Sequence, residues 1–157
     1  MEMQIDTHTI DLKANQLEVA QQELEAMLRR IRDAYGRAIL MATEKVSLAE
    51  RSVQVAAGHY ADVKANREAI IRQLGSEHSV QLALSDAQLK DAEQMFRDAI
   101  DFREKEVKAA EELRARAEGA ISEAESSFHS GSQVISSMVD DLDLSRKLLE
   151  GYKKMLP

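Results

Sequence analysis

Apolar residues recur at alternating steps of three and four between residues 10 and 74, the spacing that places side chains on one face of an α-helix. No proline interrupts this stretch, because Pro157 is the only proline of the chain. The pattern therefore predicts one helix of about 65 residues, roughly 100 Å long. Its apolar stripe consists of Ile10, Ala14, Leu17, Ala20, Leu24, Leu28, Ile31, Tyr35, Ala38, Ala42, Val46, Ala49, Val53, Ala56, Tyr60, Val63, Ile70 and Leu74.

This stripe has one irregularity. From Ala42 to Val46 a step of four follows another step of four, which is a stutter in a heptad pattern. A heptad stripe on so long a helix predicts coiled-coil pairing with further helices, because the helix cannot cover its own stripe. Gly58, followed by Ala61 and Ala65, predicts close approach of a second backbone, and a kink is the alternative.

Two breaks divide the remainder of the chain. Gly75 directly follows the last stripe residue, as a glycine in a left-handed helix cap does, so the first helix should end there. A second helix, over about 79–128, begins either at Ser79 or at Ser85, which has capping-box spacing with Gln88.

The second break is predicted at residues 129–133. This segment contains Gly131, and Ser130 again has capping-box spacing with Gln133. A third helix, over about 134–155, carries its own apolar stripe.

A short turn after the first helix makes the second helix antiparallel to it, so that residue i lies beside residue 153 − i within about one turn. Residues 10–24 then extend beyond the end of the second helix. We expect the third helix to fold back onto the first two, and the alternative is that it continues straight past the first helix. The resulting three-helix base would contain Ile39, Leu40, Leu113, Leu148 and Leu149.

The predicted fold class is therefore all-α, with residues 1–157 forming a single helical domain. Within it we expect an elongated antiparallel helical hairpin or coiled coil with a third C-terminal helix. Its composition agrees with this, since 44% of the residues are hydrophobic, 31% are charged and only 4% are aromatic.

The net charge of −7 disfavours a general binder of nucleic acid or of anionic membranes. The charge is unevenly distributed: residues 10–74 contain ten Lys and Arg against nine Asp and Glu, whereas residues 79–128 contain seven against twelve. Segments of opposite bias should favour pairing with each other, although each exposed ion pair contributes only about 0–1 kcal/mol.

Cellular location is constrained only by what the sequence lacks. There is no cysteine, and the first six residues include Glu2 and Asp6 but no apolar segment of a secretory signal. The longest fully apolar run, residues 38–42, is far too short to cross a membrane. A cytoplasmic protein is the expectation, and export without a cleaved signal is the alternative.

The candidate chemistry is sparse. The four histidines lie far apart in sequence, and Asp140, Asp141 and Asp143 match neither a calcium loop nor a magnesium motif, so we expect no metal site and no cofactor. Without a phosphate loop or a nucleophile motif, we expect no enzymatic activity. The one basic cluster is a candidate site for a phosphate or an acidic partner, although a solvated helix face is the simpler interpretation: Arg29, Arg30, Arg32 and Arg37.

These observations predict a protein–protein interaction module, a rod-like scaffold, stalk or adaptor that self-associates. The expected contact is the uncovered stripe of Ile10, Leu17 and Leu24, because exposed apolar area favours oligomerisation. In size and shape, a small cysteine-free helical hairpin also resembles the stalk proteins of bacterial type III export and the subunits of secreted filaments. A third hypothesis is a membrane-shaping module of the BAR or ESCRT-III kind, which the acidic segment 79–128 disfavours.

Overall fold

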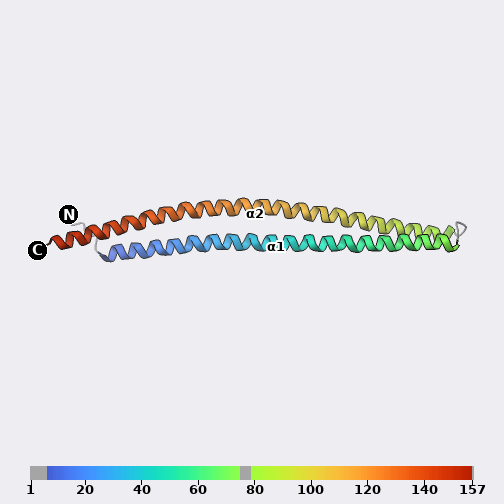
Figure 1. The fold of residues 1–157 in the computed structure, drawn as a ribbon, viewed down its shortest axis with the longest axis horizontal. Helices are drawn as coiled ribbons and strands as arrows, with labels where there is room; N and C mark the ends of the chain where they lie inside the picture. The colour runs from blue at the N-terminus through green and yellow to red at the C-terminus, as the bar shows by residue number, and fades with distance from the viewer. Residues whose placement is uncertain (1–6, 75–78, 157) are drawn as a thin grey trace. The chain divides into compact units, whose positions relative to one another are not determined.

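The computed structural model describes residues 7–74 and 79–156 and contains, within these ranges, two α-helices and no strand. Helix α1 comprises Thr7–Leu74 and helix α2 comprises Ser79–Met155 (Figure 1). The predicted all-α class is confirmed. Helix α1 ends at Leu74 as predicted, while the proposed cap at Gly75 lies outside the described residues.

The two helices pack against each other in antiparallel orientation, as a helical hairpin. Their contacts divide the chain into two units: the terminal unit, with Met1–Gly36 and Ala117–Pro157, and the turn unit, Arg37–Arg116. In the terminal unit Gln21 is hydrogen-bonded to Ser132, which is the predicted register of i beside 153 − i. In the turn unit the rings of Tyr60 and Phe96 are stacked, with centroids 6.1 Å apart, within one turn of that register.

The predicted stripe of α1 is the side that faces α2. Every stripe residue from Ile10 to Ile70 is buried or partly buried, and only Leu74, at the end of the helix, is exposed. Ala42 and Val46 are both partly buried and Ala49 is fully buried, so the burial pattern follows the stutter as well.

The most deeply buried residues are small. Ala49 and Ala117 have no exposed surface, Ala92 is 1% exposed, and Ile10 is the one large side chain among the described residues with less than 2% exposed. Alanine leaves little side chain between two helix backbones, so these positions allow α1 and α2 to approach closely. The core is therefore a narrow line of contacts between two helices.

The predicted break at residues 129–133 is wrong, because α2 continues without interruption from Ser79 to Met155. Gly131 lies instead where α2 crosses Leu24 of α1: a Cβ atom at this position would be 2.9 Å from Leu24 Cδ1. Gln133 does not act in a cap either, since its Nε2 lies 3.1 Å from Nε2 of His129, one turn earlier in the same helix. The glycine accommodates a neighbouring side chain and does not end a helix.

With no third helix in the described part of the chain, the expected uncovered end of α1 is also wrong. The C-terminal part of α2 covers it: Arg146 forms an ion pair of 2.6 Å with Asp11, and Lys153 Nζ donates to the Thr7 hydroxyl at 3.3 Å. Ile10 is consequently only 1% exposed, and Leu17 and Leu24 are partly buried.

The expected three-helix base is not formed, for the same reason. Leu148 and Leu149 belong to the terminal unit, whereas Ile39, Leu40 and Leu113 belong to the turn unit. Leu148 and Leu40 are 67% and 59% exposed, so neither has the buried position that the base required.

Gly58 also differs from expectation. A Cβ atom there would meet nothing within 4 Å, so no second backbone of the described chain approaches it. The glycine faces open space in the interior of a continuous helix, where it costs about 1 kcal/mol relative to alanine.

Replacing Ile10 with alanine should lower the free energy of unfolding by about 2 kcal/mol, because it removes a fully buried side chain. Leu12→Ala is the matched control, since Leu12 is 50% exposed on the same turn, and it should cost less than about 1 kcal/mol. Urea denaturation followed by circular dichroism measures both. Equal effects would contradict the covering of Ile10 by α2.

Gly58→Ala should raise the free energy of unfolding by about 1 kcal/mol through helix propensity alone. Gly131→Ala should raise the free energy of unfolding much less, because the new Cβ atom forces the Leu24 side chain away from its rotamer, at a cost of about 0.5–1.5 kcal/mol. The urea midpoints of the two variants measure this difference. In a Leu24→Ala background, Gly131→Ala should raise the free energy of unfolding about as much as Gly58→Ala does. If both glycine variants were stabilised equally in the wild-type background, the contact between Gly131 and Leu24 would be refuted.

Candidate interaction surfaces

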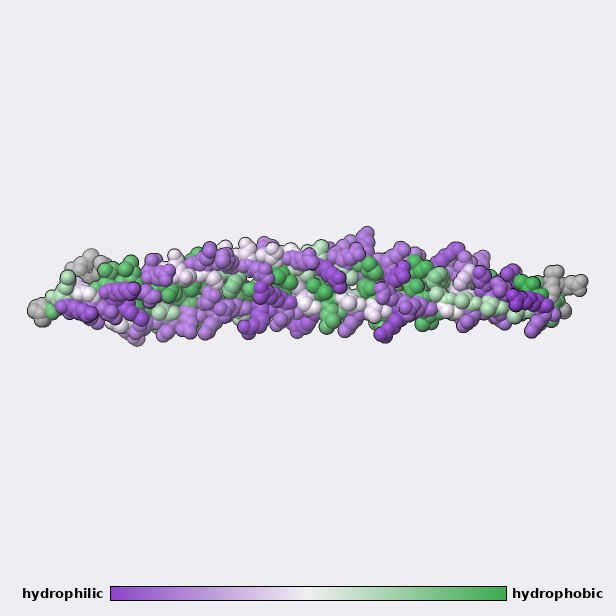
Figure 2. Space-filling view, viewed as in Figure 1, coloured by the Kyte–Doolittle hydropathy of each residue, from purple (hydrophilic) through white to green (hydrophobic). Residues whose placement is uncertain are grey.

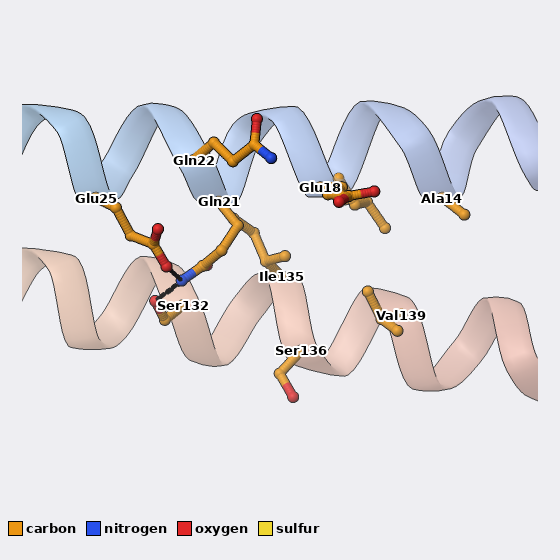
Figure 3. Close-up of a pocket in the computed structure, with 10 residues that line it drawn as sticks. Ala14, Glu18, Gln21, Gln22, Glu25, Ser132, Ile135, Ser136 and Val139 are labelled. Carbon is orange, nitrogen blue, oxygen red and sulfur yellow. Dashed lines mark hydrogen bonds between the residues drawn. The ribbon is translucent and has the colours of Figure 1, made fainter.

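A polar pair interrupts the apolar contact between the helices of the terminal unit. Ser132 of α2 donates its hydroxyl proton to Oε1 of Gln21 on α1 at 3.1 Å, and it accepts from Nε2 of Gln21 at 3.0 Å (Figure 3). The same Nε2 lies 3.4 Å from Oε1 of Glu25, one turn along α1. Gln21 and Ser132 are both partly buried, and each meets the hydrogen-bonding needs of the other.

A groove of about 780 Å³ surrounds this pair. Apolar side chains of both helices line it beside the carboxylates of Glu18 and Glu25 (Figure 3). The titratable side chains of this lining are the two carboxylates of Glu18 and Glu25. A polar pair within an apolar stripe disfavours other registers of the two helices, since sliding either helix would separate the amide from the hydroxyl.

A second groove in the terminal unit, of about 520 Å³, contains part of the predicted arginine cluster. Arg29 and Arg32 line it together with His129. Arg32 forms an ion pair of 2.7 Å with Glu125 of α2, and Arg37 also makes an interaction of its own. Arg30 is exposed, outside that lining. The binding of these arginines to a phosphate or an acidic partner stays a prediction.

Ser85 contrasts with Ser132. It lies inside α2, which begins at Ser79, so the proposed capping box at Ser85 is not formed. Its side chain is 2% exposed, and its hydroxyl oxygen has no hydrogen-bond partner among the described residues. A buried hydroxyl without a partner is destabilising, since folding removes its hydrogen bonds to water.

The turn unit exposes a row of large apolar residues on each helix. On α1 the row is Met41, Leu48 and Val55, at steps of seven, and these residues are 60%, 59% and 73% exposed. On α2 it is Met95 and Phe102, also seven apart, with 56% and 50% exposed. Hydrophobic residues reach the surface between hydrophilic ones in the space-filling view (Figure 2).

Both rows lie on the same side of the helix pair. Leu48 and Val55 each directly precede a buried alanine of the stripe, and Phe102 directly precedes the partly buried Arg103. These are equivalent positions relative to the contact line. Two antiparallel helices are related by a local two-fold axis perpendicular to the plane that contains both helix axes. Rotation about this axis keeps every position on its own side of that plane, so equivalent positions of α1 and α2 lie on the same side of the pair. We call this surface, Met41, Leu48, Val55, Met95 and Phe102, the apolar side.

On the opposite side of the turn unit, charged residues follow several of the same stripe positions. Glu50 on α1 and Arg97 and Glu104 on α2 are exposed there, whereas the uncharged Thr43 and Ala57 follow two of the other positions. The apolar side was not predicted from the sequence, because the buried stripe of α1 is the stronger apolar pattern. A seven-residue repeat of Met41, Leu48 and Val55 could have indicated it.

The described residues contain no cluster of metal ligands and no helix able to cross a membrane. Within residues 7–74 and 79–156, no three His, Cys, Asp or Glu side chains are grouped so that they could hold a metal ion. In the same ranges, neither helix combines the length and apolar character needed to cross a membrane. Comparisons with protein-family models, curated proteins and solved structures found no match.

Alanine substitutions at Ser132 and Ser85 should change stability in opposite directions. Ser132→Ala should lower the free energy of unfolding by about 1 kcal/mol, because it leaves the partly buried amide of Gln21 without its partner. Ser85→Ala should raise it by about 1 kcal/mol, because it removes an unpaired buried hydroxyl and improves helix propensity. Thermal and urea denaturation measure both variants, and a loss of stability for Ser85→Ala would contradict the unpaired state of its hydroxyl.

Proposed function

We propose that this chain is a non-enzymatic protein–protein interaction module that associates with copies of itself through its helical hairpin. The observation that carries the proposal is the apolar side of the turn unit, where five large apolar side chains are at least half exposed. Apolar residues gathered on one side of a pair of helices are typical of a surface that another molecule covers.

The energetics of the hairpin support this proposal. Two helices that contact each other along one narrow line bury mainly alanine, which contributes little hydrophobic free energy. Burying the exposed remainder of the apolar side would remove roughly 100 Å² of surface per side chain from water, or about 1,000 Å² for two copies. An interface of this size is near the lower limit of specific interfaces, and association also costs about 4–15 kcal/mol, so a weak dimer, in the micromolar range, is the expectation.

The pattern of contacts supports a two-stranded antiparallel coiled coil as the architecture of this module. The buried stripe follows heptad spacing with one stutter, and the Gln21–Ser132 pair provides the polar contact that such stripes use to fix register. Ion pairs between α1 and α2, such as Arg32–Glu125, lie at the exposed edges of the contact. All of these groups position helices, and none requires a substrate.

Sedimentation velocity over a concentration series tests the proposal. At about 1 µM the protein should sediment near the 17.6 kDa mass of one chain, and at high micromolar concentration the weight average should rise toward that of a dimer. Far-UV circular dichroism at both ends of the series should report the same helix content, because association joins folded hairpins. A single-chain mass throughout the series would rule out self-association.

A further inference from the structure

We infer that the apolar side of the turn unit docks on the apolar side of a second copy, with α1 of each chain lying antiparallel to α2 of the other. This inference rests on the self-association proposed above and specifies its surface and geometry. Each copy would contribute Met41, Leu48 and Val55 from α1, and Met95 and Phe102 from α2, to one interface.

Two charged residues at the edge of this surface point to a second copy as the occupant. Lys45 directly precedes the stripe residue Val46 on α1, and Glu106 directly precedes the partly buried Val107 on α2. They occupy equivalent positions of the two helices and therefore lie on the same side of the pair. Glu106 is partly buried, yet neither it nor Lys45 belongs to any of the ion pairs of the described chain.

These residues lie near each other in level between two copies. Within the turn unit Thr43 is hydrogen-bonded to Arg114 and Tyr60 is stacked on Phe96, so Glu106 lies five to six residues, about one and a half turns, from the level of Lys45. If α1 meets α2 of the second copy at the same levels, the long side chains of Lys45 and the opposing Glu106 can bridge this offset, and a two-fold axis produces this pair twice. Leu48 and Val55 then cover Phe102 of the second copy, which lies between their levels.

The overall charge of the two helices favours the same pairing. In the turn unit α1, residues 37–74, carries six Lys and Arg against four Asp and Glu, whereas α2, residues 79–116, carries seven against nine. Stacking α1 on α2 of the other copy therefore brings opposite biases together. In the competing arrangement a two-fold axis passes through the centre of the surface, and α1 packs on α1 and α2 on α2. This arrangement brings the two Glu106 side chains together, so like charges disfavour it.

The available area fits a weak but specific dimer. The exposed parts of the five apolar side chains amount to roughly 100 Å² each, so two copies bury about 1,000 Å² of apolar surface, near the lower limit of specific interfaces. An interface of this small area is consistent with the micromolar dissociation constant expected of the module.

Exchanging the charges at positions 45 and 106 tests the geometry. Lys45→Glu places two carboxylates opposite each other in a homodimer, and Glu106→Lys places two amines there, so each variant should raise the dissociation constant at least about tenfold. An equimolar mixture of the two variants should recover association within about threefold of wild type, because both interfacial pairs of the heterodimer are then Lys–Glu. Sedimentation velocity with one variant fluorescently labelled measures the heterodimer directly.

The mixture separates this interface from a pair within one chain. If Lys45 and Glu106 paired within one hairpin, both chains of the mixture would still carry like charges, so failure to recover would overturn the inference. Variants that associate as strongly as wild type would overturn it as well. A wild-type protein that is monomeric at every concentration would instead refute the proposed function itself.

A second pair of variants tests the surface independently of the charged residues. Leu48→Glu, on the apolar side, should raise the dissociation constant more than about tenfold, whereas Ser47→Glu adds the same charge one residue away on another face and should change it less than about threefold. Both positions are exposed, so far-UV circular dichroism should show unchanged helix content. Equal weakening by the two variants would exclude the apolar side as the interface.

Discussion

Two helices that pack only on each other share a single line of contact, and the rest of this structure depends on that constraint. Each helix buries one narrow stripe, and Ala49, Ala92 and Ala117 bring the backbones close together along it. Because small residues contribute little hydrophobic free energy, specificity must come from the few positions where a larger or polar group meets its counterpart. Gly131 opposite Leu24 and Gln21 opposite Ser132 are such positions in the terminal unit.

The same constraint explains why large apolar residues are exposed in the turn unit. Met41, Leu48, Val55, Met95 and Phe102 lie on one side of the pair, and no third helix among the described residues covers them. The hairpin therefore combines a narrow internal core with exposed apolar surface, and this combination is the basis of the proposed self-association.

Much of the fold could be predicted from periodicity. The stripe from Ile10 to Ile70, its stutter after Ala42, the end of α1 at Leu74 and the antiparallel register all agree with the structure. Each follows from the local spacing of apolar residues or from chain length, which tertiary contacts reinforce here. The candidate surface was less predictable, since whether Leu48 is buried or exposed depends on the number of helices around α1.

The sequence by itself determined the all-α class, the extent of α1, the face of α1 that is buried and the absence of cysteine chemistry. Only the tertiary structure shows why residue 131 is a glycine. A Gly–Ser segment with capping-box spacing looks the same in sequence whether it ends a helix or leaves space for a neighbouring side chain. The side chain of Leu24, more than a hundred residues away, requires the space that this glycine leaves. With α2 continuous at that point, Ile10 is covered, the three-helix base does not form, and the large apolar residues Leu48 and Val55 of the turn unit stay exposed.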